Sequence, residues 1–236
     1  MRRHIALLVL SCVFAPPAMA QYTYYPDYNY PYGNYYKVYL SPATHNPDKQ
    51  TCLSLQGVPT STENDLAWAN SWSAADGFSD NDTTYPSTYD LTERGYTVQV
   101  GYATNQEKVN QANAFGAHIF LSVHSNGSAG GCSTPASTAG TWSMHRTNDT
   151  NSQNLAAALT YYLASVSPGT NDKTCLISSC SSYSTLYEME YSTAFSRAYL
   201  EQEFHDFEAG ARWMYYDISW QHRIAGALDY HFGSPR

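Results

Sequence analysis

Apolar runs and stretches with helical spacing alternate along the first half of the chain. Residues 37–41, 95–102 and 118–127 are short, apolar and rich in strand-forming side chains, which is typical of strands buried in a sheet. Between these runs, apolar side chains recur every three or four positions over 62–76 and 105–117, as they do on one face of a helix. The pattern therefore predicts three strands joined by two helices.

The second half of the chain continues this alternation. Residues 141–146 and a short segment near 197–201 are predicted strands, and 152–166 has the spacing of a strong helix. One or two further helices are expected over 207–232. Strands that alternate with helices form parallel or mixed sheets between helical layers. We expect an α/β fold with a single domain over 37–236, in which helices cover both faces of a mostly parallel mixed sheet.

Two polar segments that contain proline, 46–61 and 78–90, are expected to be loops. The helix after the first loop begins with a clear N-terminal signal. Thr62 can cap the helix, and Asp65 three residues later completes a capping box. Glu63 lies in the same first turn, where its charge suits the helix N-terminus.

The first 20 residues have the features of a secretory signal. Two arginines precede the apolar stretch IALLVLSCVFA, and the sequence Ala-Met-Ala fits cleavage after Ala20. The stretch is too short to span a membrane. Cys12 leaves a lipoprotein signal as a second interpretation, although the residues before it fit poorly. We expect a mature protein that begins at Gln21 and is secreted or periplasmic.

Residues 21–36 are dominated by tyrosine, which accounts for eight of the sixteen positions. The other residues include Pro, Asn and Gly, and neither a helical nor a strand period is visible. We expect a tail or linker here. An aromatic segment that contacts glycan or another surface is the functional alternative.

The charge balance argues against a nucleic-acid partner. The formal net charge of −8 becomes −10 once the two arginines of the signal are removed, and the chain has no basic run. An acidic surface of this kind attracts neither nucleic acid nor anionic membranes. After the signal, no segment is long and apolar enough for membrane insertion. We expect a soluble monomer.

The mature chain has four cysteines, an even number that suggests two disulfides in an oxidising compartment. Cys175 and Cys180 are close in sequence and are predicted to pair, which leaves Cys52 with Cys132. The spacing contains no C-x-x-C pair and does not resemble a zinc finger.

Residue types that bind metal gather where the predicted strands end. His45 follows the first strand, His124 lies near the end of the third, and Glu201 ends a later one. Glu63 begins the helix that follows the first strand. Ligands of open α/β sheets collect at the carboxyl ends of the strands. Two histidines and a carboxylate, with one position left for water, form a catalytic zinc set, and a further carboxylate can act as the base.

Six stretches resemble the zinc-dependent N-acetylmuramoyl-L-alanine amidases of type 3, which act on bacterial cell walls. The likeness covers about residues 37–233. The stretches are VYLSPATH, STENDLAWANSWSAAD, NQEKVNQANAFGAHIFLSVHSNG, SQNLAAALTYYL, AYLEQEFHDF and HRIAGALDYHFG.

The resemblance implies that His45, Glu63 and His124 bind Zn²⁺ and that Glu201 is catalytic. It also implies that the substrate is peptidoglycan and that the bond cleaved joins the lactyl group of N-acetylmuramic acid to L-alanine. The two rival interpretations are an inactive relative that binds the wall without cleaving it, and a zinc peptidase that cuts within the stem peptide.

The chain departs from the usual family pattern at three positions. Thr44 and Asn46 flank His45 where many members have glycine, and Phe207 replaces an asparagine. The first departure puts the shape of the His45 loop in question more than the ligand itself.

Other carboxylates compete with Glu201 for the catalytic role. At strand spacing, Glu201 and Glu203 point to the same face, so periodicity leaves both open, and only the register of the family motif favours Glu201. Glu188 either lines the cleft or lies on the surface, and we expect the surface. His205 lies beside the catalytic segment and is a candidate supporting residue.

Overall fold

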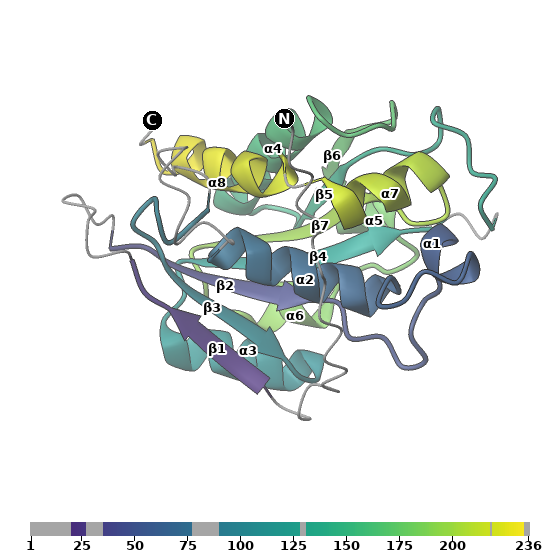
Figure 1. Ribbon diagram of the computed structural model, residues 1–236. Helices are drawn as coiled ribbons and strands as arrows, with labels where there is room; N and C mark the ends of the chain where they lie inside the picture. Colours follow the sequence, from purple (N-terminus) through teal and green to yellow (C-terminus); the bar gives the residue numbers. More distant parts are fainter. Residues whose placement is uncertain (1–19, 27–34, 77–89, 128–130, 218, 234–236) are drawn as a thin grey trace, which may run out of the picture.

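The computed structural model describes residues 20–26, 35–76, 90–127, 131–217 and 219–233 (Figure 1). Most of the predicted signal and most of the predicted loop 78–90 lie outside these residues. The strands are β1 (Ala20–Tyr24), β2 (Lys37–Pro42), β3 (Thr97–Tyr102), β4 (Ile119–Asn126), β5 (Trp142–His145), β6 (Lys173–Leu176) and β7 (Ser196–Phe204). The helices are α1 (Cys52–Leu55), α2 (Glu63–Ala75), α3 (Asn105–Phe115), α4 (Thr150–Ala164), α5 (Ile177–Cys180), α6 (Tyr187–Tyr191), α7 (Glu208–Tyr216) and α8 (Ser219–His231).

The strands form one sheet in the order β1-β3-β2-β4-β7-β5-β6. Strands β3, β2, β4 and β7 are parallel neighbours. The edge strand β1 is antiparallel to β3, and β5 is antiparallel to β7 while it pairs in parallel with β6. The predicted mostly parallel mixed sheet is therefore confirmed.

Helices cover both faces of this sheet (Figure 1), and the strand residues alternate between the two layers. Val38 and Leu40 of β2 belong to a large core with α2, α4, α7 and α8. Tyr39, which lies between them, packs into a second core with α3, α5 and α6. In β4, Phe120 belongs to this second core as well. Successive side chains of each strand thus alternate between the two cores, as expected in a sheet that is buried on both faces.

The prediction of a tail over 21–36 is wrong for its first residues, because β1 is an edge strand of the sheet. Tyr22 pairs with Val100 of β3, and the Tyr22 ring lies 5.8 Å from the ring of Trp68 in α2. On the other face, Gln99 donates a hydrogen bond to Thr23. The strand period covers only five residues, and the tyrosines that follow conceal it.

Several short elements were not predicted. Helix α1 occupies part of the expected loop 46–61 and begins at the N-cap Thr51. Strand β6 and the helices α5 and α6, each of four or five residues, lie between α4 and β7. Such lengths carry too little periodicity to be recognised in a sequence. Among the described residues, no helix is long and apolar enough to cross a membrane.

One of the two predicted disulfides is present. Cys175 and Cys180 are bonded and connect the end of β6 to α5. Cys52 and Cys132 are free thiols, so the second pairing is corrected. Burial, followed by a hydrogen bond with the Cys132 thiol, raises the pKa of Cys52 to about 12. The two residues are thus neighbours without being bonded.

Candidate metal centre

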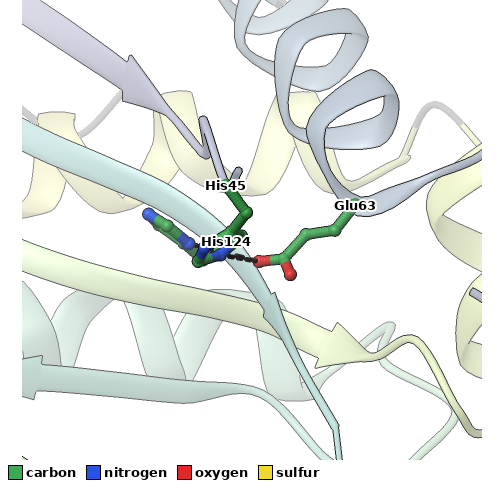
Figure 2. Close-up of side chains that lie close together, drawn as sticks. All are labelled: His45, Glu63 and His124. Atoms are coloured by element: carbon green, nitrogen blue, oxygen red, sulfur yellow. Dashed lines mark hydrogen bonds and ion pairs between the residues drawn. The ribbon is translucent and has the colours of Figure 1, made fainter. Parts of the chain in front are cut away.

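Three of the predicted site residues meet at the carboxyl-terminal edge of the sheet (Figure 2). His45 lies on the segment after β2, Glu63 is the first residue of α2, and His124 belongs to β4. The Oε1 atom of Glu63 is 3.2 Å from His45 Nε2 and 3.2 Å from His124 Nδ1. One ligand atom from each residue lies within 4.8 Å of the other two. The side chains of Glu63 and His124 are only 3% and 7% exposed, whereas that of His45 is 34% exposed.

The segment that carries His45 is fixed to the start of α2. The His45 N–H donates to Asn64 Oδ1 at 2.8 Å, and Asn64 Nδ2 donates back to the His45 carbonyl at 2.9 Å. The Asn64 N–H donates to Asp48, and the Glu63 N–H donates to the carbonyl of Lys49. Since these bonds join the segment after β2 to the first turn of α2, the backbone positions of His45 and Glu63 are set together.

The first turn of α2 separates a capping carboxylate from a site carboxylate. Thr62 and Asp65 form the predicted capping box, in which the Asp65 carboxylate accepts from the Thr62 N–H and the Thr62 hydroxyl oxygen accepts from the Asp65 N–H. The Glu63 carboxylate turns to the histidines instead. It also accepts a hydrogen bond of 3.2 Å from the N–H of Ser125, the residue after His124.

Burial and the mutual contacts of the three residues shift their pKa values in opposing directions. Burial opposes ionisation of Glu63, but hydrogen bonds with His124 and His45 outweigh it and lower the pKa of this carboxyl. The bond with Glu63 raises the pKa of His45. For His124 burial prevails and lowers the pKa, which favours the neutral imidazole. A neutral histidine beside an ionised carboxylate is the state in which both residues bind metal.

Glu201 lies beside this group, because it pairs with His124 in the register of β7 and β4. Its Oε2 atom is buried and has no hydrogen-bond partner among the described residues. Burial, and then the charge of Glu63, raises the pKa of Glu201 well above the usual value for a carboxyl. Buried side-chain oxygens usually have a hydrogen-bond partner, so Glu201 differs in this respect from most buried carboxyl groups.

The structure separates Glu201 from Glu203, which strand periodicity could not do. From His124 to Asn126, β4 advances two residues while β7 advances three, from Glu201 to Phe204. This β-bulge breaks the alternation of side chains. The Glu203 carboxylate accepts hydrogen bonds from Ser167, from the Gly169 N–H at 2.9 Å and from the Phe204 N–H at 2.9 Å. Both carboxylate oxygens of Glu203 therefore accept hydrogen bonds, from the segment after α4 and from the next residue of β7.

The expectation that Glu188 lies on the surface is wrong. Glu188 is 2% exposed and forms an ion pair with Lys108, whose Nζ is 3.2 Å from its Oε1. Burial opposes ionisation of Glu188, but the charge of Lys108 and then that of His124 lower its pKa. The stretch LYEMEY offers no sign of this burial, because the partner lies 80 residues earlier in the chain.

His205 lies against the same group, as expected for a supporting residue. Its Nδ1 is 3.0 Å from Ser125 Oγ, 3.1 Å from the Ser125 carbonyl and 4.0 Å from Glu63 Oε2. A Cβ atom at Gly127 would lie 2.6 Å from His205 Nε2. Glycine at this position therefore makes room for the imidazole beside Glu63.

Aromatic side chains next to the histidines were missed in the sequence. The Tyr199 ring stacks on His124 at a centroid distance of 4.4 Å. Tyr183 and Tyr187 line a pocket of about 340 Å³ together with His45 and His124. The 22 tyrosines of the chain gave no reason to choose these three. The pocket gives the exposed side of His45 a place for a bound molecule.

The fold is an α/β fold that is shared with solved amidase structures. The N-acetylmuramoyl-L-alanine amidase from Clostridium difficile 630 has a TM-score of 0.59 and 17% identity, over 85% of this chain and 96% of that one. The catalytic domain of CwlV, an N-acetylmuramoyl-L-alanine amidase from Bacillus (Paenibacillus) polymyxa var. colistinus, has a TM-score of 0.57 and 16% identity, over 84% and 96%. The N-acetylmuramyl-L-alanine amidase Ami1 from Mycobacterium abscessus has a TM-score of 0.55 and 12% identity, over 84% and 98%.

The sequence itself matches no protein-family model and no curated protein. The resemblance to amidases that the motifs indicated is thus confirmed by the fold, over nearly the whole length of these catalytic domains. The chain shares this fold with proteins to which its sequence is only 12%, 16% or 17% identical.

Proposed function

We propose that this protein is a peptidoglycan hydrolase that cleaves the amide between N-acetylmuramic acid and the L-alanine of the stem peptide. The observation that carries the proposal is the group of His45, Glu63 and His124 at the carboxyl edge of the sheet. Two solved structures that share this fold, from Clostridium difficile 630 and from Bacillus (Paenibacillus) polymyxa, are named as N-acetylmuramoyl-L-alanine amidases, and that name describes this linkage. The shared fold supports this chemistry only by analogy. The side chains of the site provide the chemical grounds for it.

The three residues fit Zn²⁺. Two imidazoles and one carboxylate are a ligand set of catalytic zinc sites, which leave a further position open. Ligand atoms about 2.1 Å from a tetrahedral zinc ion lie roughly 3.4 Å apart, and the two separations from Glu63 Oε1 are 3.2 Å. A cation here would also offset the repulsion between Glu63 and Glu201 and give the buried Glu201 oxygen a nearby positive charge.

When bound, zinc supplies a Lewis acid that polarises the scissile carbonyl and makes water a better nucleophile at neutral pH. The protein residues then have separate tasks. Glu201 accepts a proton from the attacking water and delivers it to the nitrogen of L-alanine, which leaves as an amine. The C–N bond breaks as the new C–O bond forms, so that water is divided between the lactyl carboxylic acid and the amine.

The surroundings of Glu201 suit this task. The position opposite His124 keeps the carboxylate at the metal group, and the pocket beside Tyr199 and Tyr187 offers an approach for the substrate. His205 packs against Ser125 and Glu63 and restricts the movement of the Glu63 carboxylate. Ligand groups that are restrained in this way lose less entropy when they bind metal.

We further propose that the protein acts outside the cytoplasm as a monomer, after removal of residues 1–20. The cleavage site predicted after Ala20 supports export, since peptidoglycan lies beyond the inner membrane. Cleavage there would leave Gln21 as the new N-terminus, within the edge strand β1.

The proposal is tested by digestion of purified peptidoglycan with the mature protein. The zinc-loaded protein should release stem peptides, treatment with a chelator should abolish release, and added zinc should restore it. A protein that binds peptidoglycan tightly and releases nothing in the presence of zinc would instead be the inactive wall-binding relative. Full release by a metal-free preparation would exclude a metal mechanism.

A further inference from the structure

A buried ion pair lies beneath the metal group, and the proposed chemistry does not use it. The side chains of Lys108 in α3 and Glu188 in α6 are 0% and 3% exposed, and their charged atoms are 3.2 Å apart. Burial of two charges costs several kcal/mol per ion and is offset only when further hydrogen bonds complete the geometry. The partners of this pair therefore show what it holds in place.

Glu188 connects the two strands that lead to the histidines. Its Oε1 accepts a hydrogen bond of 2.5 Å from Ser41 in β2, and its Oε2 accepts one of 2.9 Å from Ser122 in β4. Ser122 lies two residues before His124 and on the same face of the strand. Ser41 lies four residues before His45. One carboxylate thus bridges Ser41 and Ser122, which are direct partners in the pairing of β2 with β4, just before the site.

Lys108 holds the segment between β2 and His45. Its Nζ donates to the carbonyl of Pro42 at 2.9 Å and to Thr44 Oγ1 at 3.3 Å. The Thr44 hydroxyl in turn donates to the carbonyl of Ala103 at 3.0 Å. Thr44 directly precedes His45 and replaces a glycine that is usual in the resembling family. Its side chain therefore gives this loop an attachment that glycine lacks.

We propose that the Lys108–Glu188 pair is a positioning device that holds His45 and His124 at the separation a metal ion requires. Both are positioning residues, since neither is one of the three proposed ligands. The inference rests on the proposed metal site but concerns how that site is built. It also makes α6, whose residues line the 340 Å³ pocket, part of the support of the metal site.

The alternative is that the pair contributes only to general stability. Replacement of a buried ion pair by apolar or neutral groups is often neutral or stabilising, whereas loss of one partner leaves an uncompensated buried charge. A pair that only stabilises should therefore become dispensable once both charges are removed. A pair that positions ligands should remain necessary for metal affinity even when stability recovers.

The experiment measures zinc affinity by competition with a chromophoric chelator, together with the unfolding midpoint, in the mature protein without substrate. The variants are Glu188→Gln, Lys108→Met and the double variant. The matched control is Asp229→Asn, which also removes a buried carboxylate charge. Asp229 in α8 binds Arg94 and Tyr96, in the core on the other face of the sheet.

We expect both single variants and the double variant to bind zinc at least tenfold more weakly, the range typical when groups that orient metal ligands are lost. The double variant should regain much of the stability that the single variants lose. Asp229→Asn should lower the unfolding midpoint and leave zinc affinity unchanged. If the ion-pair variants do not fold, Ser41→Ala and Ser122→Ala each remove one bond to Glu188 and should weaken zinc binding severalfold.

The inference is overturned if the double variant binds zinc as the wild type does, or if Asp229→Asn weakens binding equally. Where only the serine variants fold, unchanged affinity in both overturns it. A wild-type protein that binds no zinc would refute the metal site and this inference together. Normal zinc binding in all variants would leave the proposed function intact and remove the positioning role alone.

Discussion

Glu201 and Glu203 are two residues apart on β7, and their surroundings differ in almost every respect. Glu201 pairs with His124 across β7 and β4, and one of its buried oxygens lacks a partner among the described residues. Glu203 is held by Ser167, Gly169 and its own neighbour Phe204. The β-bulge opposite His124 and Asn126 produces the difference. These different surroundings support the proposal that Glu201 is the base and that Glu203 stabilises the fold.

The largest expected effect follows from Glu201→Gln. The substitution keeps the size of the side chain and removes the proton acceptor, so turnover of peptidoglycan should fall about 100-fold or more. Zinc should still bind, because the three proposed ligands are intact. Steady-state kinetics and metal content, measured on the same preparation, check this. Near-normal turnover would show that another group takes the proton.

Glu203→Gln should have the opposite profile. An amide at this position places an NH₂ group where the carboxylate accepts backbone N–H groups, which leaves a buried donor without an acceptor. The free energy of unfolding should fall by about 1–3 kcal/mol, while turnover by the folded protein stays within a fewfold of wild type. Denaturant titration beside kinetics tests this. If the Glu203→Gln variant were inactive and the Glu201→Gln variant active, the base would be Glu203 and the assignment would be reversed.

Ser167→Ala tests the structural role of Glu203 with a smaller change, and we expect the smallest effect on stability and activity. It removes one donor to Glu203 and leaves the two N–H groups in place. The unfolding free energy should fall by about 1 kcal/mol, and both turnover and zinc content should be unchanged. If turnover by the folded variant fell although its zinc content stayed normal, the contacts of Glu203 would affect the geometry of the site.

The sheet and the main helices could be predicted because they repeat a pattern over many residues. The two-residue period of β2 and β4 and the capping box at Thr62 are local properties of the sequence. The three proposed ligands lie near the ends of such elements, and the resemblance to the amidase motifs selected them. The edge strand β1 was missed because its five residues are followed by further tyrosines.

The remaining errors concern features that depend on distant partners. The burial of Glu188 is set by Lys108 and by two serines on other strands. The side to which Glu203 points depends on a bulge that only strand pairing reveals. Cys52 and Cys132 lie near each other, as a pairing would require, yet they remain thiols in the structure. A single sequence contains none of these contacts explicitly.

The proposed reaction is hydrolysis of the lactyl–alanine amide at the site of His45, Glu63 and His124. The most direct test is mass spectrometry of the products that the zinc-loaded protein releases from purified peptidoglycan, with Glu201→Gln as the matched control. We expect intact stem peptides that begin with a free L-alanine amine, glycan strands with an unsubstituted lactyl carboxylate, and almost no product from the control. Fragments cut within the stem peptide, with the lactyl amide intact, would contradict it and identify a peptidase.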